Sequence, residues 1–158
     1  MVKIDNDMDQ FDLKILKIIQ VNNKITSETL AREVGLSSSA CQRRINSMRK
    51  KKIIEKDVSI ISRNKLDRKI TIIVQVLSEK EGVEHEVQFK KTMFLAPEVM
   101  QCYYITGDYD YVLITTFKDM SEYEKFTRKY FLDNPNIKRF NSMVVMNKVK
   151  ESLEIPVN

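Results

Sequence analysis

The 158-residue sequence has few of the residues that interrupt or cross-link a chain: three glycines, three prolines, two cysteines and one histidine. So little glycine and proline excludes a low-complexity linker or tail. Cys41 and Cys102 lie in separate segments, form no Cys-x-x-Cys pair and gain no metal-ligand spacing from His85. We therefore expect no metal site, and we expect both cysteines to be reduced and buried.

Long apolar runs are also missing, so no segment is expected to span a membrane. Residues 1–10 are acidic and polar, unlike a secretory signal. These features predict a cytoplasmic protein without membrane contact. Hydrophobic residues make up 42% of the chain and charged residues 31%, which is a globular composition with room for one ordinary domain or two small ones.

Positive charge is concentrated in one short segment. The net charge is +5, and residues 43–56 contain seven basic side chains against one acidic side chain. A focused basic excess is what a nucleic-acid-binding surface requires. The alternative is a solvated helix face, which is the usual role of a run of charges.

The first fifty residues have the pattern of three helices. Apolar residues in 9–22 recur at helical spacing, and Thr26 and Ser37 are suited to cap the second and third helices. Gly35 follows the second helix, where a left-handed residue closes a helix. Two helices joined by such a tight turn predict a helix-turn-helix.

The third helix has two chemically different sides. Cys41, Ile45 and Met48 cluster on one side, which we expect to pack on the other helices. The other side is predicted to contact base edges in the major groove of double-stranded DNA, and the end of the helix to contact phosphates. The predicted DNA-binding residues are Ser38, Ser39, Gln42, Arg43, Asn46, Arg49, Lys50, Lys51 and Lys52.

After Lys52 the pattern becomes rich in β-forming residues. Residues 53–62 are predicted to form a strand or wing that completes a DNA-binding domain over 1–62, and the polar segment 63–69 is a predicted linker. In the second domain, 70–158, the pattern predicts strands at 70–78, 99–106, 111–117 and 141–149, and helices at 82–96 and 121–133.

This order is the β-α-β-β-α-β ferredoxin-like plan, so the expected fold class is α+β, with two helices on one face of an antiparallel sheet. Val83, Val87 and Phe94 are expected among the inner residues of the first of these helices. The other face of the sheet is left open, which favours burial against a second copy of the chain.

Four motifs in this order resemble those of the Lrp/AsnC (feast/famine) regulators: "LKILKIIQVN" (13–22), "LAREVGLSSSACQRRI" (30–45), "CYYITGDYDYVL" (102–113) and "MVVMNKVK" (143–150). The resemblance implies a winged helix-turn-helix joined to a ligand-sensing domain. It also implies DNA-binding dimers that assemble into tetramers or octamers, and an amino-acid effector bound between sensing domains.

In the family pattern the third helix reads DNA, and its cysteine, arginine and following aliphatic residue match Cys41, Arg44 and Ile45. The residues that the resemblance assigns to the effector site are Thr106, Gly107, Asp108, Tyr109, Asp110 and Ser142.

The sequence departs from the family pattern in two places. No glycine precedes the predicted wing, so either the third helix continues or Lys51 or Lys52 adopts the conformation that ends it. Where the family has Thr-x-Thr, this chain has Phe140-Asn141-Ser142, which predicts a smaller or reshaped polar pocket. That change leaves open a regulator of the same fold that acts on DNA without an effector.

The same residues allow other interpretations. Gly107 and its neighbours form an ordinary turn sequence, and Asp108 with Asp110 resembles an acid-base pair. No nucleophile, metal set or phosphate-binding loop accompanies that pair, so an enzyme or a cofactor is not expected. His85 is expected in solvent, and Tyr103, Tyr104, Tyr109 and Tyr111 in sheet packing. A pure interaction module would not need the outward face around Arg43.

Overall fold

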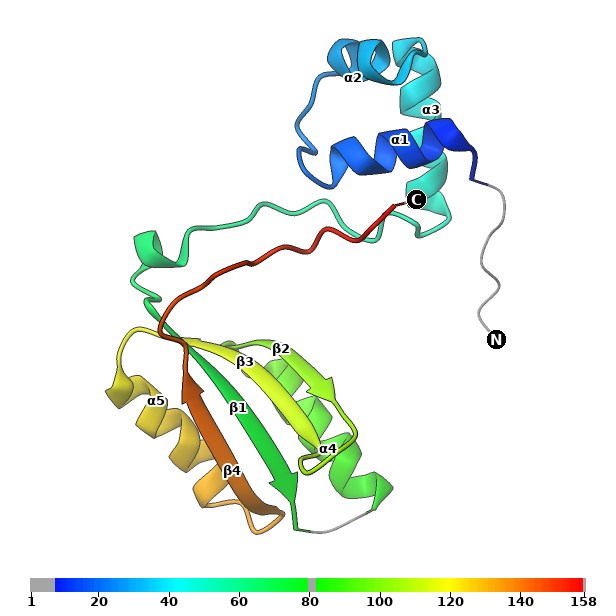
Figure 1. Cartoon of the computed structure of the whole chain (residues 1–158). Coiled ribbons are helices and arrows are strands. Elements are labelled where there is room, and N and C mark those ends of the chain that lie inside the picture. Colours follow the sequence, from blue (N-terminus) through cyan, green and yellow to red (C-terminus); the bar gives the residue numbers. More distant parts are fainter. Residues whose placement is uncertain (1–7, 80–81, 158) are drawn as a thin grey trace. The chain divides into compact units, whose positions relative to one another are not determined.

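A computed structural model describes residues 8–79 and 82–157 (Figure 1). Residues 1–7 of the acidic amino-terminal segment therefore lie outside the described residues. The chain divides into two compact units. We call them the head (Met1–Ile60 with Lys150–Asn158) and the sheet domain (Ile61–Val149). Residues 150–158, predicted as part of the second domain, cluster with the head in this division, and the Gln20 side chain pairs with the backbone of Ile155.

The head contains three helices: α1 (Gln10–Ile19), α2 (Ser27–Val34) and α3 (Ser38–Lys50). Each begins at a residue whose side chain accepts a hydrogen bond from a free backbone N–H of the first turn, as an N-cap does. These residues are Asp9, Thr26 and Ser37, so both predicted caps are present. Gly35 has φ +83° and closes α2, which confirms the tight turn between α2 and α3.

Helix α3 ends without a glycine. Lys51 is still helical, and Lys52 adopts the left-handed conformation with φ +60°. The N–H of Ile53 donates to the carbonyl of Met48 at 2.9 Å, and the N–H of Lys52 donates to the carbonyl of Arg49 at 3.1 Å. This is the hydrogen-bond pattern of a Schellman motif, here with lysine at the position that usually holds glycine. Of the two alternatives left open by the sequence, α3 therefore ends, and Lys52 ends it.

Seven buried side chains form the core of the head: Ile15, Leu30, Ala31, Val34, Cys41, Ile45 and Met48. They come from all three helices, and the three from α3 are the predicted inward residues. Because about 3.6 residues complete one turn, burying these three positions leaves the opposite side of α3 in solvent.

Of the strand or wing predicted at 53–62, the strand is wrong, because residues 55–62 form neither helix nor strand. Val58, Ile60 and Ile61 stay 58%, 88% and 58% exposed. A β-rich sequence becomes a strand only where a neighbouring strand supplies hydrogen-bond partners, and none pairs with this segment in the described part of the chain. The expected linker contains one 3-10 turn, Arg63–Leu66.

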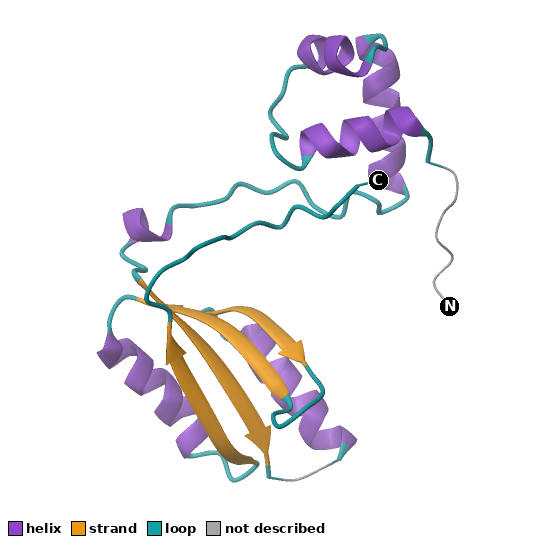
Figure 2. Cartoon of the chain, viewed as in Figure 1, coloured by secondary structure: helices purple, strands orange, loops and turns teal. Residues whose placement is uncertain are grey.

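The sheet domain has the predicted order of elements, and Figure 2 shows its helices and strands as two layers. Its strands are β1 (Ile70–Ser78), β2 (Val99–Tyr104), β3 (Tyr111–Phe117) and β4 (Ile137–Val144). Its helices are α4 (Val83–Leu95) and α5 (Met120–Thr127), and α5 continues as a π turn over Arg128–Leu132. The strand order is β2-β3-β1-β4 with every pair antiparallel, which confirms the α+β ferredoxin-like fold. The last strand lies at 137–144 instead of 141–149.

The inner residues predicted for α4 are wrong. Phe89 and Met93 are buried against the sheet, whereas Val83, Val87 and Phe94 are 75%, 58% and 87% exposed. The helix has two apolar stripes about 120° apart, and periodicity alone does not say which one meets the sheet.

Two further expectations about single side chains are corrected. Cys41 is buried as expected, but Cys102 is exposed because it lies on β2, a strand at the edge of the sheet. His85 is half-buried instead of solvated, and it borders a small cavity with Gln88 and Asn136.

The left-handed Lys52 leads to a stability prediction. Replacing Lys52 with Gly should raise the free energy of unfolding of the head by about 1 kcal/mol, because glycine adopts positive φ without a Cβ clash. Lys52→Ala removes the same charge and keeps the clash, so it serves as the matched control. Urea unfolding followed by helical circular dichroism measures both. Equal stability of the Gly and Ala variants would contradict the conformation assigned to Lys52.

Candidate nucleic-acid interface and loop site

The outward side of α3 carries the predicted polar set. Arg43, Asn46 and Lys50 are exposed on the side opposite Cys41, Ile45 and Met48. Together with two neighbours they line an open hollow, which we call the α3 hollow; its residues are Arg43, Asn46, Ser47, Arg49 and Lys50. All five side chains can donate hydrogen bonds and three are cations, so the surface suits an anion. Ser47 was missed from the sequence because its small side chain lies between the two stripes.

Several predicted DNA-binding side chains already bond to each other. The Gln42 amide donates to the Asn46 side-chain oxygen at 3.1 Å, one turn along α3. The hydroxyls of Ser39 and Ser37 are 3.2 Å apart, and Ser38 is half-buried in the first turn. These contacts hold the polar side chains in place before any ligand binds.

Arg49 is engaged by an acidic residue beyond the helix. Its Nε donates to Oδ2 of Asp57 at 2.9 Å, and its Nη2 donates to Oδ1 at 3.1 Å. The hydrogen bonds from Arg49 lower the pKa of the Asp57 carboxyl below its ordinary value. The predicted phosphate contact at Arg49 is thus neutralised by a pair within the head.

Arg44, the arginine of the family pattern, faces α1 and not the outward side. Its guanidinium donates to Asp12 at 2.9 Å, pairs with Asp9 at 2.8 Å and lies 5.6 Å above the ring of Phe11. A hydrogen bond from the Asp12 backbone, and then the pairing with Arg44, lower the pKa of Asp9. Arg44 therefore fixes α3 against the start of α1.

The loop between β2 and β3 is held by its last residue. The N–H of Asp110 donates to Val76, and its carbonyl accepts from Ile105 at 2.8 Å. Its carboxylate accepts a 2.7 Å hydrogen bond from the backbone N–H of Ser78, at the end of β1. Gly107 has φ +124°, which makes the sharp turn possible. Asp110 is a structural residue of this loop, and its carboxylate is already engaged.

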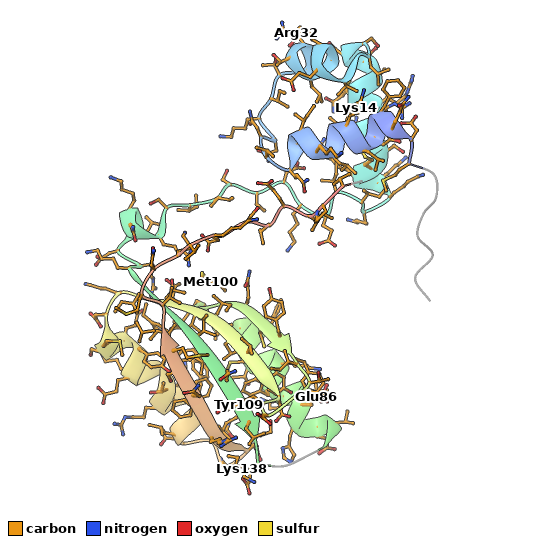
Figure 3. The ribbon with its side chains drawn as sticks, viewed as in Figure 1. Lys14, Arg32, Glu86, Met100, Tyr109 and Lys138 are labelled. Carbon is orange, nitrogen blue, oxygen red and sulfur yellow. The ribbon has the colours of Figure 1, made fainter. Side chains whose placement is uncertain are left out.

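The other loop residues leave polar groups at the surface. Thr106 and Asp108 are exposed, and the Asp108 carboxylate makes no hydrogen bond or ion pair among the residues the structure describes. The guanidinium of Arg139, on β4, lies 5.0 Å from the centre of the Tyr109 ring. Figure 3 shows Tyr109 at the same end of the sheet as Lys138. Arg139 was missed from the sequence because only strand pairing brings β4 to this loop.

Ser142 does not join the loop within one chain. It pairs with Val74 on β1, so its side chain points to the helix side of the sheet, where its hydroxyl bonds to that of Tyr123 on α5. Phe140 points the same way and packs 4.9 Å from Phe131. The ring of Phe140 packs on the core of the domain within this chain, and the smaller or reshaped polar pocket stays a prediction.

The face of the sheet without helices is largely apolar. Ile73, Leu77, Val112 and Ile114 lie on it half-buried, and Tyr103 is 51% exposed. Among these residues the Asn141 amide donates to the Gln75 side chain at 3.1 Å. We call this surface the open face. Tyr111 lies on the opposite side, where burial raises its pKa to about 12 and where it packs against Phe89 and Tyr104, as expected for sheet packing.

Residues 8–79 and 82–157 contain no group of three side chains suited to hold a metal ion. No helix among these residues is long and apolar enough to cross a membrane.

Comparison with known proteins defines the class of this chain. Residues 8–55 match the sequence profile of winged helix-turn-helix DNA-binding domains, and residues 71–155 match that of the Lrp/AsnC ligand-binding domain. The chain is thus a DNA-binding regulator with an attached ligand-binding domain, a class that is not enzymatic. The chain belongs to the Lrp/AsnC family of transcriptional regulators.

Its relatives share nearly the full length. An uncharacterised HTH-type transcriptional regulator of Sinorhizobium fredii is 46% identical over 96% of this chain and 89% of its own. The leucine-responsive regulatory protein of Haemophilus influenzae is 29% identical over 95% and 90%. A crystal structure of an AsnC family regulator from Agrobacterium tumefaciens is 30% identical, covers 94% and 97% of the two chains and has a TM-score of 0.89. An L-Met complex of a Neisseria meningitidis regulator is 26% identical, covers 96% and 97% and has a TM-score of 0.91.

Proposed function

We propose that this regulator recognises specific DNA sequences as a homodimer in the cytoplasm, with α3 in the major groove. The observation that carries this proposal is the pair of opposite sides on α3: one docks in the core through Cys41, Ile45 and Met48, and the other exposes Arg43, Asn46 and Lys50. A major groove admits one helix and presents donors and acceptors to such side chains.

The residues of α3 divide by position. Ser38, Ser39, Gln42, Arg43 and Asn46 lie in the first two-thirds of the helix, where base contacts concentrate in helix-turn-helix proteins. Lys50, Lys51 and Lys52 lie at its end, where they contact phosphates and fix the register. The charge of Arg49 is compensated by Asp57 before DNA binds.

The open face supports the dimer. One face of the sheet is covered by α4 and α5, whereas Ile73, Val112 and Ile114 on the other have no covering layer within the chain. A second copy that packs its own open face on this surface buries both sets of apolar residues. Two heads in one dimer then address half-sites about one DNA turn apart. Further association of dimers gives the tetramers or octamers that the family resemblance implies.

An amino acid or related small molecule is the proposed effector, and the loop after β2 is its proposed site. The exposed Asp108 carboxylate suits an ammonium, and the Arg139 guanidinium beside Tyr109 suits a carboxylate. The similar Neisseria meningitidis regulator was crystallised with L-Met. We place this site between the sensing domains of neighbouring chains. An effector bound there changes the equilibrium between two arrangements of the chains only if it binds one arrangement more tightly than the other.

One observation favours the second candidate, a regulator of the same fold that acts without an effector. Ser142 is bonded to Tyr123, and the Asp110 carboxylate is bonded to Ser78, so two of the six proposed effector residues have structural partners. Asp108, Thr106, Tyr109 and the backbone of Gly107 then carry any effector binding together with Arg139.

The first prediction for this function concerns base reading. Arg43→Ala should weaken binding to a preferred duplex, selected from a random pool, by about 1–3 kcal/mol, and binding to random DNA by less. Lys52→Ala is the control for a phosphate contact, with equal losses on both duplexes and a salt slope smaller by about one. Fluorescence anisotropy at several salt concentrations measures both variants. Equal losses for Arg43→Ala would make Arg43 a phosphate contact.

The second prediction concerns assembly. Ile114→Asp should convert the dimer to monomers at micromolar concentration, because it buries an unpaired carboxylate in the proposed interface. Leu132→Asp makes the same chemical change on the π turn after α5, away from the open face, and should leave the dimer intact. Light scattering decides the outcome. A wild-type monomer, or an unchanged dimer of Ile114→Asp, would refute the open-face dimer.

The third prediction concerns the effector. In a DNA titration with a panel of amino acids, Asp108→Asn should reduce the response to any active amino acid at least tenfold, with basal DNA binding unchanged. Asp110→Asn tests the structural role of Asp110. Weakening the hydrogen bond that its carboxylate accepts from Ser78 should lower the melting temperature of the protein. A full response by Asp108→Asn would place the effector elsewhere, and an unresponsive wild-type protein would support the effector-free regulator.

A further inference from the structure

Arg49 and Asp57 join the reading helix to the segment that leaves the head. Arg49 lies in the last turn of α3, and Asp57 lies five residues after the left-handed Lys52, in the segment 53–60 that leads to the sheet domain. Their two hydrogen bonds, at 2.9 and 3.1 Å, form a bidentate pair. This geometry is the one that an arginine uses to bind a phosphate.

The same guanidinium borders the α3 hollow. Arg43, Asn46, Ser47 and Lys50 line it together with Arg49, so an anion placed there has several donors within one short stretch of α3. DNA supplies such an anion along each strand, and every lysine or arginine that neutralises a phosphate contributes to affinity through counterion release. An arginine that is already paired with a carboxylate contributes little to this release, because its charge is compensated before DNA binds.

We propose that Asp57 determines the affinity of the head for DNA. It binds Arg49 in place of a backbone phosphate and so compensates one of the three positive charges that line the α3 hollow. This inference rests on the proposed DNA-binding role of α3. When Arg49 exchanges the Asp57 carboxylate for a phosphate, the head gains a phosphate contact.

The exposure of the pair allows this exchange. The Arg49 and Asp57 side chains are 43% and 44% exposed. An ion pair that is so exposed to water is weak enough for a phosphate to displace the carboxylate. Arg49 also has N–H groups on its other edge that Asp57 does not use. A phosphate bound there lies within the screening length of about 8 Å from the carboxylate and is repelled by it. Both routes predict that removing the Asp57 charge strengthens DNA binding.

In a rival interpretation Asp57 orients Arg49 toward DNA, and removing its charge would then weaken DNA binding. Orienting Arg49 only restricts one exposed side chain, whereas the Asp57 carboxylate places a full negative charge beside the phosphate and repels it. We expect the charge to outweigh the orientation, so Asp57→Asn should tighten binding.

The test compares Asp57→Asn with Glu55→Gln in the full-length protein. Both changes remove one negative charge from the same segment, and Glu55 is exposed and makes no ion pair within the described residues, so the comparison isolates the pair with Arg49. On a random duplex at low salt, Asp57→Asn should bind about three- to tenfold more tightly than Glu55→Gln. Its salt slope should be steeper by about 0.9, the value for one added phosphate contact.

A double-variant comparison removes the remaining ambiguity. In an Arg49→Gln background, Asp57→Asn should change DNA binding no more than Glu55→Gln does, because no guanidinium is left to release. Circular dichroism melting confirms that each variant is folded. Equal binding by Asp57→Asn and Glu55→Gln with Arg49 present would overturn the proposal, as would weaker binding by Asp57→Asn than by the wild type. A wild-type protein without salt-dependent DNA binding would instead overturn the proposed function itself.

Discussion

The burial of one side of α3 is the constraint on which the rest of the head depends. Cys41, Ile45 and Met48 are almost fully removed from water by α1 and α2, and this fixes the rotation of α3 about its own axis. Arg44 adds a polar lock, since it ties the flank of α3 to Asp9 and Asp12 at the start of α1. With the rotation fixed, helical periodicity alone determines that Arg43, Asn46 and Lys50 face outward.

The end of α3 and the segment after it extend this constraint toward the sheet domain. Lys52 turns the chain in a left-handed conformation, Ile53 packs back on the core of the head, and Asp57 then holds Arg49. One short stretch thus ends the reading helix, sets the direction of the chain that leaves it and determines how much positive charge the helix presents. The Arg49–Asp57 pair compensates one of the three cations that line the α3 hollow.

The sheet domain uses its two faces differently. One face carries the core under α4 and α5, and on the other Ile73, Val112 and Ile114 have no covering layer within the chain. The loop after β2 lies at the end of this sheet and is anchored through Asp110, so its shape depends on β1 and not on a ligand. Such a loop offers preorganised groups at the surface, and the exposed Asp108 carboxylate is one of them.

The sequence by itself determined the helix-turn-helix, the order of the sheet domain and the two sides of α3, because caps, Gly35 and periodicity are local signals. It did not determine which apolar stripe of α4 is buried, and 53–62 did not become a strand, since both depend on contacts with distant residues. For the same reason, the site residues predicted from the sequence include residues that have structural partners in the folded chain. Only tertiary structure showed that α1 engages Arg44 and that Asp57 engages Arg49. Only strand pairing turned Ser142 and Phe140 inward and brought Arg139 to Tyr109. The physical reason is that a side chain's partners are set by the packing of whole elements, whereas its residue type and spacing fix only the chemistry it can offer.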